Sequence, residues 1–288
     1  MKLNTPVEFP HSSIGIGYSD RIMVLGSCFA GCTGRKLAET GFDAMSNPFG
    51  TLYNPASIAR SIERLQSGEH FSMKDCVQLG SGSQKIGSFH HHTLAAKGSA
   101  EEFLESANAA LDKASAFWRG CGKVIITLGT SWCYRHRDSN MTVANCLKRN
   151  AAEFERFFLS RDETLELTDK IAGCGKDIIF TVSPIRHMAD GAHGNSLSKA
   201  NLLLCTDEII RRHKENCEYF PAYEIVMDEL RDYRFYAEDM VHPSLQAENY
   251  IFERFIDWAL SPEDKEKYRL NEKSFRRSQH IDMGVNLR

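Results

Sequence analysis

Two stretches that lie far apart in the chain carry residue types suited to acyl chemistry. Gly26-Ser27-Cys28 follows an apolar run and precedes a helical pattern, and Asp239 lies three residues before His242. A carboxylate at that spacing can bond the Nδ1–H of the histidine, and it stabilises the imidazolium once Nε2 has taken a proton. The two stretches together predict a nucleophile served by an oriented histidine base.

The nucleophile candidates are Ser27 and Cys28. A sharp strand-to-helix turn exposes its side chain at the end of a sheet, and the helix N-terminus behind it stabilises a thiolate or an oxyanion. Successive residues near a strand end point in different directions, so only one of the two can face His242. A small, buried and unreactive Cys28 is the alternative, because most free cysteines are buried.

The elements that must position these residues alternate along the chain. Apolar runs predict strands at 22–25, 42–46, 123–128, 178–182 and 222–227, and amphipathic patterns predict helices at 31–39, 54–65, 101–119, 144–160, 196–214 and 244–260. This alternation predicts an α/β fold with three layers, in which a parallel sheet is flanked by helices. We expect one domain over residues 1–260, with an irregular insertion or lid at about 68–100 and a peripheral charged segment at 261–288.

Ligands of open parallel sheets bind beyond the carboxyl ends of the strands. The stretches expected at that edge are 26–28, 47–50, 129–131, 183–187 and 239–243. Arg186 could hold a phosphate or carboxylate, and a salt bridge that caps its loop is an equal alternative. His187 beside it is a second candidate for substrate contact. His193, Asn195 and Lys199 are expected to shape the pocket wall, and Tyr53 and Trp132 to be structural or to line the cleft.

Composition narrows the function classes. The chain has 288 residues, 42% of them hydrophobic and 25% charged, with a net charge of -3, which is typical of a globular protein. We expect no nucleic-acid partner because no basic stripe is present, and no membrane partner because no long apolar run or signal peptide is found. The nine cysteines are irregularly spaced without a CxxC pair, which favours the reducing cytoplasm and neither a disulfide framework nor a zinc site. We expect no metal and no cofactor, and a surface or lid role for His90, His91 and His92.

Several blocks of the sequence resemble the GSCFA family, a group of bacterial proteins similar to SGNH/GDSL hydrolases. They are GSCFA (26–30), NPFGTLYNP (47–55), ITLGTS (126–131), VANC (143–146), SPIRH (183–187) and DMVHPS (239–244). The resemblance implies a flavodoxin-like sheet. It also implies that Cys28 occupies the place of the nucleophilic serine, that Ser27 occupies the aspartate position of G-D-S, and that Asp239 and His242 form the D-x-x-H block.

The resemblance also suggests where an oxyanion would be held. SGNH hydrolases carry four sequence blocks, and the second supplies a glycine whose N–H helps to hold the oxyanion. Gly50 is the candidate for this glycine. The third block, G-x-N-D, keeps only its glycine, as Gly129, and it is followed by Thr130 and by Ser131 at the asparagine position. Ser131 could donate in place of that asparagine, and Asn47 or Asn54 could also substitute for it. Loss of one oxyanion donor lowers turnover by about a hundred- to a thousandfold in a known hydrolase, so this departure bears on activity.

Two functions from different classes follow from these patterns. The first is a hydrolase or acyltransferase that acts on an ester or thioester of an acylated carbohydrate or a small acyl donor. The second is a non-catalytic module on the same fold that binds a sugar nucleotide or coenzyme A. Asp239 and His242 favour the enzyme, whereas the altered third block favours the binding module. The residues do not indicate an oligomeric state.

Overall fold

The main sheet has five parallel strands in the order β10-β9-β5-β1-β2. The computed structural model describes residues 5–285. The strands are β1 (Arg21–Gly26), β2 (Asp43–Ser46), β5 (Lys123–Leu128), β9 (Asp177–Val182) and β10 (Cys217–Tyr219). Counted within this sheet, the order is 2-1-3-4-5, which is the flavodoxin-like arrangement. The predicted α/β fold with a parallel sheet is confirmed.

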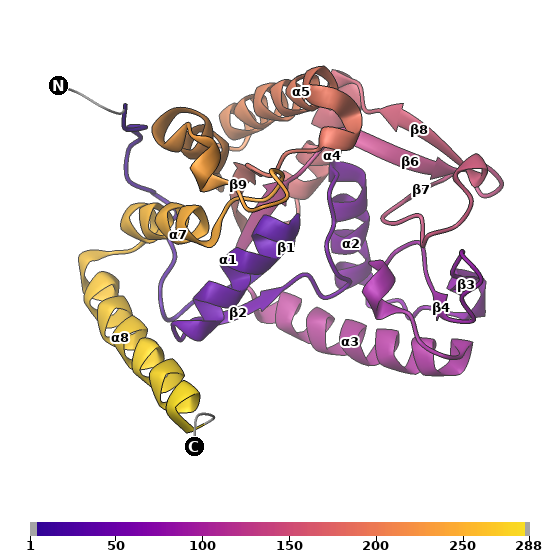
Figure 1. Cartoon of the computed structure of the whole chain (residues 1–288), viewed down its shortest axis with the longest axis horizontal. Helices are drawn as coiled ribbons and strands as arrows, with labels where there is room; N and C mark the ends of the chain where they lie inside the picture. The colour runs from indigo at the N-terminus through magenta and orange to yellow at the C-terminus, as the bar shows by residue number, and fades with distance from the viewer. Residues whose placement is uncertain (1–4, 286–288) are drawn as a thin grey trace.

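Helices cover both faces of this sheet, as Figure 1 shows. Ile22 and Val24 of β1 pack with α1 (Cys28–Glu39) and α7 (Leu245–Ala259), whereas Met23 and Leu25 pack on the other face. That other face is covered by α2 (Pro55–Ser67), α3 (Ala100–Gly120), α4 (Arg161–Ala172) and α5 (Gly191–Arg212). The alternation follows from the period of two in a strand.

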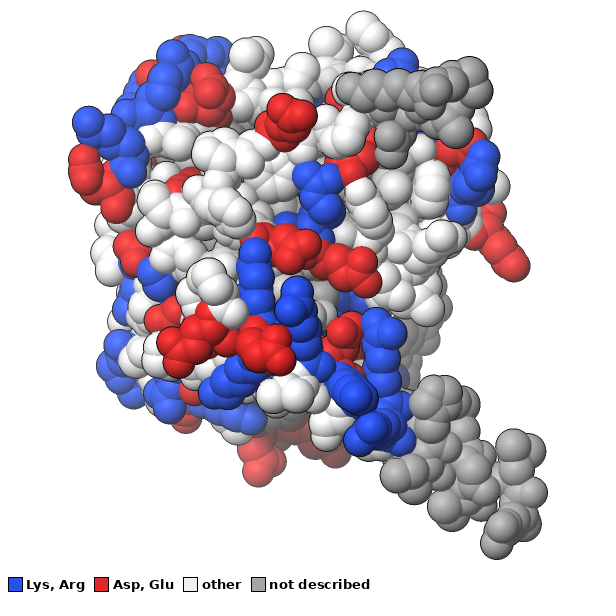
Figure 2. Space-filling view, turned by 90° about the vertical axis from the view of Figure 1, so that its left-hand side faces the viewer, with Lys and Arg blue, Asp and Glu red and all other residues white. Residues whose placement is uncertain are grey.

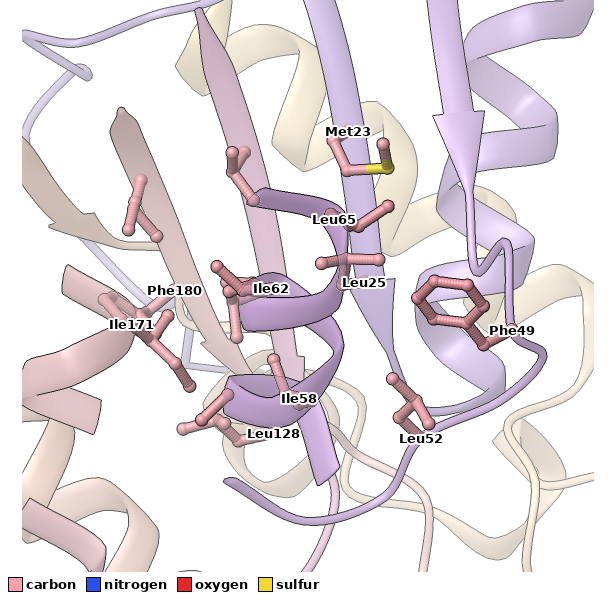
Figure 3. Close-up of a cluster of buried hydrophobic side chains, with 14 of the residues drawn as sticks. Met23, Leu25, Phe49, Leu52, Ile58, Ile62, Leu65, Leu128, Ile171 and Phe180 are labelled. Carbon is pink, nitrogen blue, oxygen red and sulfur yellow. The ribbon is translucent and has the colours of Figure 1, made fainter. Parts of the chain in front are cut away.

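The α2 helix shows how sequence spacing builds this core. Ile58, Ile62 and Leu65 recur at helical spacing and are all buried, in one cluster with Leu25 and Phe180 of the sheet (Figure 3). Asn54 accepts a hydrogen bond from the Ser57 N–H at 2.9 Å, and Pro55 occupies the first helical position. The helix therefore begins where its capping residues predict.

The helix predicted over 144–160 is wrong. This region contains β8 (Phe154–Phe158), which pairs antiparallel with β6 (Trp132–His136), and β6 pairs with β7 (Met141–Val143). Leu147 and Lys148 adopt positive φ values of 52° and 55°, which a helix interior does not allow. A helix begins only at Arg161, where Ser160 caps α4. This small sheet lies on the opposite side of the molecule from α7 and α8 (Pro262–Val285) (Figure 1).

The strand predicted over 222–227 is also wrong. A short helix, α6 (Ala222–Glu224), continues into a π-helix at Ile225–Leu230. Ala222, Ile225 and Val226 are buried in the core at helical spacing, which an apolar run of this length does not distinguish from a strand. The fifth strand is instead β10, five residues earlier in the chain.

The segment predicted as a lid packs against α2 and α3. It forms 3₁₀ turns at Met73–Asp75 and Thr93–Ala95 and a short antiparallel pair, β3 (Val77–Gln78) with β4 (Ile86–Gly87). Phe71 and His91 are each 3% exposed, and the His91 ring packs against the rings of Phe49 and Phe103. The expected surface role is therefore wrong for His91. The N–H of His92 donates to the Phe49 carbonyl at 3.0 Å, so the segment also holds the loop after β2.

The C-terminal segment predicted as peripheral forms α8, which docks through Tyr268 beside Phe252 of α7. On the face shown in Figure 2, Lys and Arg side chains are interspersed with Asp and Glu. Among the helices that lie within residues 5–285, none has the length and apolar character needed to cross a membrane.

Gly26, the last residue of β1, holds the loop after β2 at the carboxyl edge of the sheet. Its N–H donates to Asn47 Oδ1 at 2.9 Å, and its carbonyl accepts the Leu52 N–H at 2.8 Å. Its φ is +137°, and a Cβ at this position would lie 2.2 Å from the Thr127 carbonyl oxygen. Only glycine fits here, because both the dihedral angle and the neighbouring backbone exclude a side chain.

We predict that Gly26→Ala lowers the free energy of unfolding by roughly 2–5 kcal/mol, from backbone strain and overpacking together. Gly122→Ala is the matched control, since a Cβ there meets nothing within 4 Å, and its effect should stay within about 0.5 kcal/mol. Urea denaturation of the two variants and the wild type measures the difference. Equal unfolding midpoints for the two variants would contradict this view of Gly26.

Candidate active site

The structure distinguishes Ser27 from Cys28. Ser27 precedes α1 as its N-cap and is 1% exposed, and its N–H donates to the Thr127 carbonyl at 3.2 Å. Its hydroxyl is buried without a hydrogen-bond partner among the described residues. Cys28 is the first residue of α1 and is partly exposed. Only the Cys28 side chain is open to a substrate in this conformation, and it lies where the N–H groups of a helix have no acceptor within the helix.

Tyr53 brings a phenol to the Cys28 thiol. Its Oη lies 3.8 Å from Cys28 Sγ. The Tyr53 carbonyl accepts the N–H groups of Gly129 at 2.9 Å and Thr130 at 2.8 Å, which ties the loop before α2 to the loop after β5. Burial, and secondly the neighbouring Cys28, raises the pKa of Tyr53, so the phenol remains a proton donor at neutral pH. No spacing signal in the sequence marks this residue, because its position depends on bonds between two loops.

Asp239 and His242 form the contact that their spacing predicts. Asp239 Oδ2 lies 2.7 Å from His242 Nδ1, and Oδ1 accepts the N–H groups of Val241 and His242 at 2.8 and 2.9 Å. These hydrogen bonds lower the pKa of Asp239 to about 2. The carboxylate therefore stays ionised and fixes the imidazole with Nε2 directed away from it. Both side chains are about half exposed, at 43% for His242 and 50% for Asp239.

The loop after β9 supports the Asp239–His242 turn. The Arg186 N–H donates to the Val241 carbonyl at 3.1 Å, and its guanidinium donates to the Met240 carbonyl at 3.0 Å. Met240 has a φ of +55°, a conformation that such backbone contacts help to maintain. Arg186 therefore caps this turn by donating to the carbonyl groups of Met240 and Val241. The sequence offered substrate contact or a capping salt bridge, and the observed cap uses carbonyl groups instead of a carboxylate.

His187 lies between this turn and Tyr53. Its ring packs edge-on against the Tyr53 ring at a centroid distance of 6.0 Å, and its N–H donates to Asn195 Oδ1 at 2.9 Å. Burial, and then the charges of Lys199 and His242, lowers the pKa of His187 to about 3. The ring is therefore neutral at physiological pH, and it connects the Tyr53 side of the site to the His242 side.

The packing of α1 against α7 brings Cys28 and His242 to the same edge of the sheet. Cys32 Sγ lies 3.0 Å from Glu248 Oε2, and Lys36 Nζ bonds Asn249 Oδ1 further along both helices. Cys28 lies one turn before Cys32 on α1, and Ser244, the cap of α7, lies one turn before Glu248. His242 precedes Ser244 by two residues. Cys28 and Val241 also pack against the same hydrophobic cluster. The nucleophile and base candidates thus share one edge.

Two of the residues expected to hold an oxyanion are engaged in local structure. The Gly50 N–H donates to the Asn47 carbonyl at 2.8 Å, so it is not free in this conformation. Asn54 is 5% exposed, and its Oδ1 caps α2. These contacts form the turn that carries Tyr53.

The third-block residues bind α5. Ser131 is fully buried, and its hydroxyl donates to the Ser198 carbonyl at 3.2 Å. Thr130 Oγ1 lies 3.0 Å from Ser198 Oγ. Ser131, which was expected to stand at the asparagine position of the third block, is thus committed to the packing of a helix.

Lys199 lies beneath this loop with its side chain 1% exposed. Its Nζ donates to the carbonyl groups of Gly129 and Ser183, at 2.7 Å each. Burial lowers the pKa of Lys199 to about 7. The amine joins the loops that follow β5 and β9. In the described part of the chain, no three His, Cys, Asp or Glu side chains are grouped to hold a metal ion.

Comparison with known proteins identifies the family of this chain. No curated protein and no solved structure matches the chain. The model of the GSCFA family matches residues 21–255, which include the elbow at Gly26–Cys28, all five strands of the main sheet and the Asp239–His242 turn. The chain belongs to the GSCFA family.

Proposed function

We propose that this chain is an SGNH-like esterase or acyltransferase with Cys28 as its nucleophile, His242 as its base and Asp239 as the residue that orients the base. The observation that carries the proposal is the accessible Cys28 thiol at the start of α1 beside the Tyr53 hydroxyl. Ser27 is buried at the adjacent position, which favours the cysteine as the nucleophile. The nine free thiols support a cytoplasmic location within this proposal.

The reaction begins when His242 Nε2 accepts the Cys28 thiol proton. The thiolate attacks the carbonyl carbon of an ester or thioester, and the carbonyl π electrons move to its oxygen. As the tetrahedral intermediate collapses, the bond to the leaving group breaks and His242 returns the proton to the departing alcohol or thiol. Water or a sugar hydroxyl then gives its proton to His242 and attacks the S-acyl group, which releases the product and restores the thiol. Asp239 stabilises the imidazolium in both halves.

The oxyanion is held by the Cys28 N–H and the Tyr53 hydroxyl. The first belongs to the helix N-terminus, which favours negative charge. The second lies beside Sγ and stays protonated because burial raises its pKa. In this proposal Tyr53 supplies the donor that an asparagine supplies in related hydrolases. A cysteine nucleophile suits thioester exchange, since thiolates both attack and leave readily, and this favours acyl transfer over hydrolysis. The substrate in this proposal is an acylated carbohydrate or a small acyl donor.

A binding module for a sugar nucleotide or coenzyme A is the second candidate. It is favoured by one observation, namely that the Gly129 and Thr130 N–H groups and the Ser131 hydroxyl are all used in structural hydrogen bonds. If Tyr53 does not act as a donor, little remains in the third block to stabilise an intermediate. The experiments below separate the two candidates, because a binding module forms no acyl-enzyme.

Incubation with 4-nitrophenyl acetate should transfer one acetyl group to the wild-type chain, and peptide mapping should locate it on Cys28. We expect Cys28→Ala to abolish this modification and Ser27→Ala, the matched neighbour, to retain it. Intact-protein and peptide mass spectrometry measure both outcomes. Undiminished acetylation of Cys28→Ala would overturn the assignment of the nucleophile.

His242→Ala should slow acyl-enzyme formation by about 10²–10⁴-fold, because the thiol loses its general base. Asp239→Asn should slow it by a smaller factor, since the imidazole keeps its place but loses the stabilising charge. His70→Ala is the control, because His70 forms a similar pair with Asp112 at 2.7 Å on the surface. Stopped-flow release of 4-nitrophenol gives the rates. A His242→Ala rate equal to that of His70→Ala would exclude the base role.

Tyr53→Phe removes only the hydroxyl beside Cys28. We expect kcat for ester hydrolysis to fall by about 10²–10³-fold with little change in KM, since the lost bond forms only in the transition state. Tyr134→Phe, which alters a partly exposed ring on β6, serves as the control. An unchanged kcat for Tyr53→Phe would show that the oxyanion is held elsewhere.

A further inference from the structure

A pocket of about 300 Å³ has none of Cys28, Tyr53 and His242 in its lining, and no part of the proposed reaction uses it. It lies between the loop after β9 and the turns that follow β10. The residues that form its polar and aromatic lining include Arg186, Asn195, Lys199, Tyr223, Arg231 and Tyr233. Its volume is at the lower end of the range for sites that bind small molecules.

The charged groups of the pocket have an excess of positive charge. The Arg186 guanidinium lies over the rings of Tyr233 and Tyr236, at 5.9 and 5.4 Å, and bonds the Met240 carbonyl rather than a carboxylate among the described residues. Arg231 faces Asp228 only at 3.5 Å, on the exposed surface. The one carboxylate in the lining, Asp232, is paired with Arg234 at 2.9 Å. The pocket is therefore suited to an anion.

Lys199 adds a buried donor to the pocket wall. An ammonium has three N–H bonds, and two of them are directed to the carbonyl groups of Gly129 and Ser183. Both partners are neutral, so the positive charge has no carboxylate among its hydrogen-bond partners, and burial of an unpaired charge is costly. An anion in the pocket would offset this cost.

The rest of the lining suits a flat ring. Tyr223, Tyr233 and Tyr236 are three aromatic side chains within one short segment, and Met188 and Met227 supply flexible apolar contacts. Aromatic faces and methionine sulfur pack well against planar rings. Part of this wall is a π-helix, Ile225–Leu230, a distortion that occurs often at functional sites.

We propose that this pocket binds an organic phosphate that carries a planar ring, with the phosphate near Arg186 and Arg231 and the ring among the tyrosines. The pocket meets the Cys28 site at two places. Arg186 lines the pocket and the adjacent His187 packs against Tyr53, while Lys199 bonds the Gly129 carbonyl. The binding of the ligand is independent of catalysis. The further idea that this organic phosphate is the part of an acyl donor or acceptor by which the protein binds it rests on the proposed function.

The test uses phenyl phosphate and phenol as probes, with binding measured by saturation-transfer NMR titration. We expect a millimolar Kd for phenyl phosphate, as befits so small a ligand, and binding of phenol at least tenfold weaker. Arg231→Gln should weaken phenyl phosphate binding at least threefold, and Lys199→Met should weaken it further. Arg119→Gln is the control, because this exposed arginine at the end of α3 lies outside the pocket lining, and this variant should bind as the wild type does.

Equal binding of the two probes, or equal losses in Arg231→Gln and Arg119→Gln, would overturn the proposal, as would the absence of any binding. Circular dichroism identifies a Lys199→Met protein that fails to fold, in which case the two arginine variants decide. The same titration on Cys28→Ala separates this proposal from the catalytic one. Retained phosphate binding with lost acylation supports both, whereas acylation of the wild type without phosphate binding rejects only the pocket.

Discussion

The close approach of Gly26 to the Thr127 carbonyl is the contact on which the site depends. With no side chain between them, β1 and β5 stay adjacent up to their last residues, and the chain can turn directly into α1. The same glycine bonds Asn47 and Leu52, so the loop after β2 is held to the same point. A side chain at Gly26 would collide with the Thr127 backbone and separate the end of β1 from β5.

The site is assembled mainly by backbone hydrogen bonds between loops. Gly129 and Thr130 hold the Tyr53 carbonyl, and Arg186 holds the turn before His242. The polar side chains of the third block are used to anchor α5 instead of facing the substrate. Tyr53 is the polar side chain that these loop contacts place beside Cys28.

The sequence predicts the main sheet well because its strands are continuous apolar runs and its helices have clear caps, such as Asn54 and Ser244. It fails at 144–160 and 222–227, where tertiary pairing and a π-helix override local pattern. At the site, Asp239 and His242 are predictable because three residues separate them. Tyr53 and Lys199 acquire their neighbours from loops distant in sequence, so no local spacing could reveal which groups they meet.

The buried histidines of the 68–100 segment make the stability of this part of the fold depend on pH. Burial lowers the pKa of His90 to about 4 and of His91 to about 3, while an exposed histidine in the unfolded chain titrates near 6.5. Below about pH 6.5 the unfolded chain therefore binds protons that the folded segment does not. The free energy of unfolding decreases as the pH is lowered from about 6.5 towards the folded pKa values. Since His92 holds the Phe49 carbonyl, acidification weakens the support of the loop after β2 while the purely apolar contacts of the sheet do not titrate.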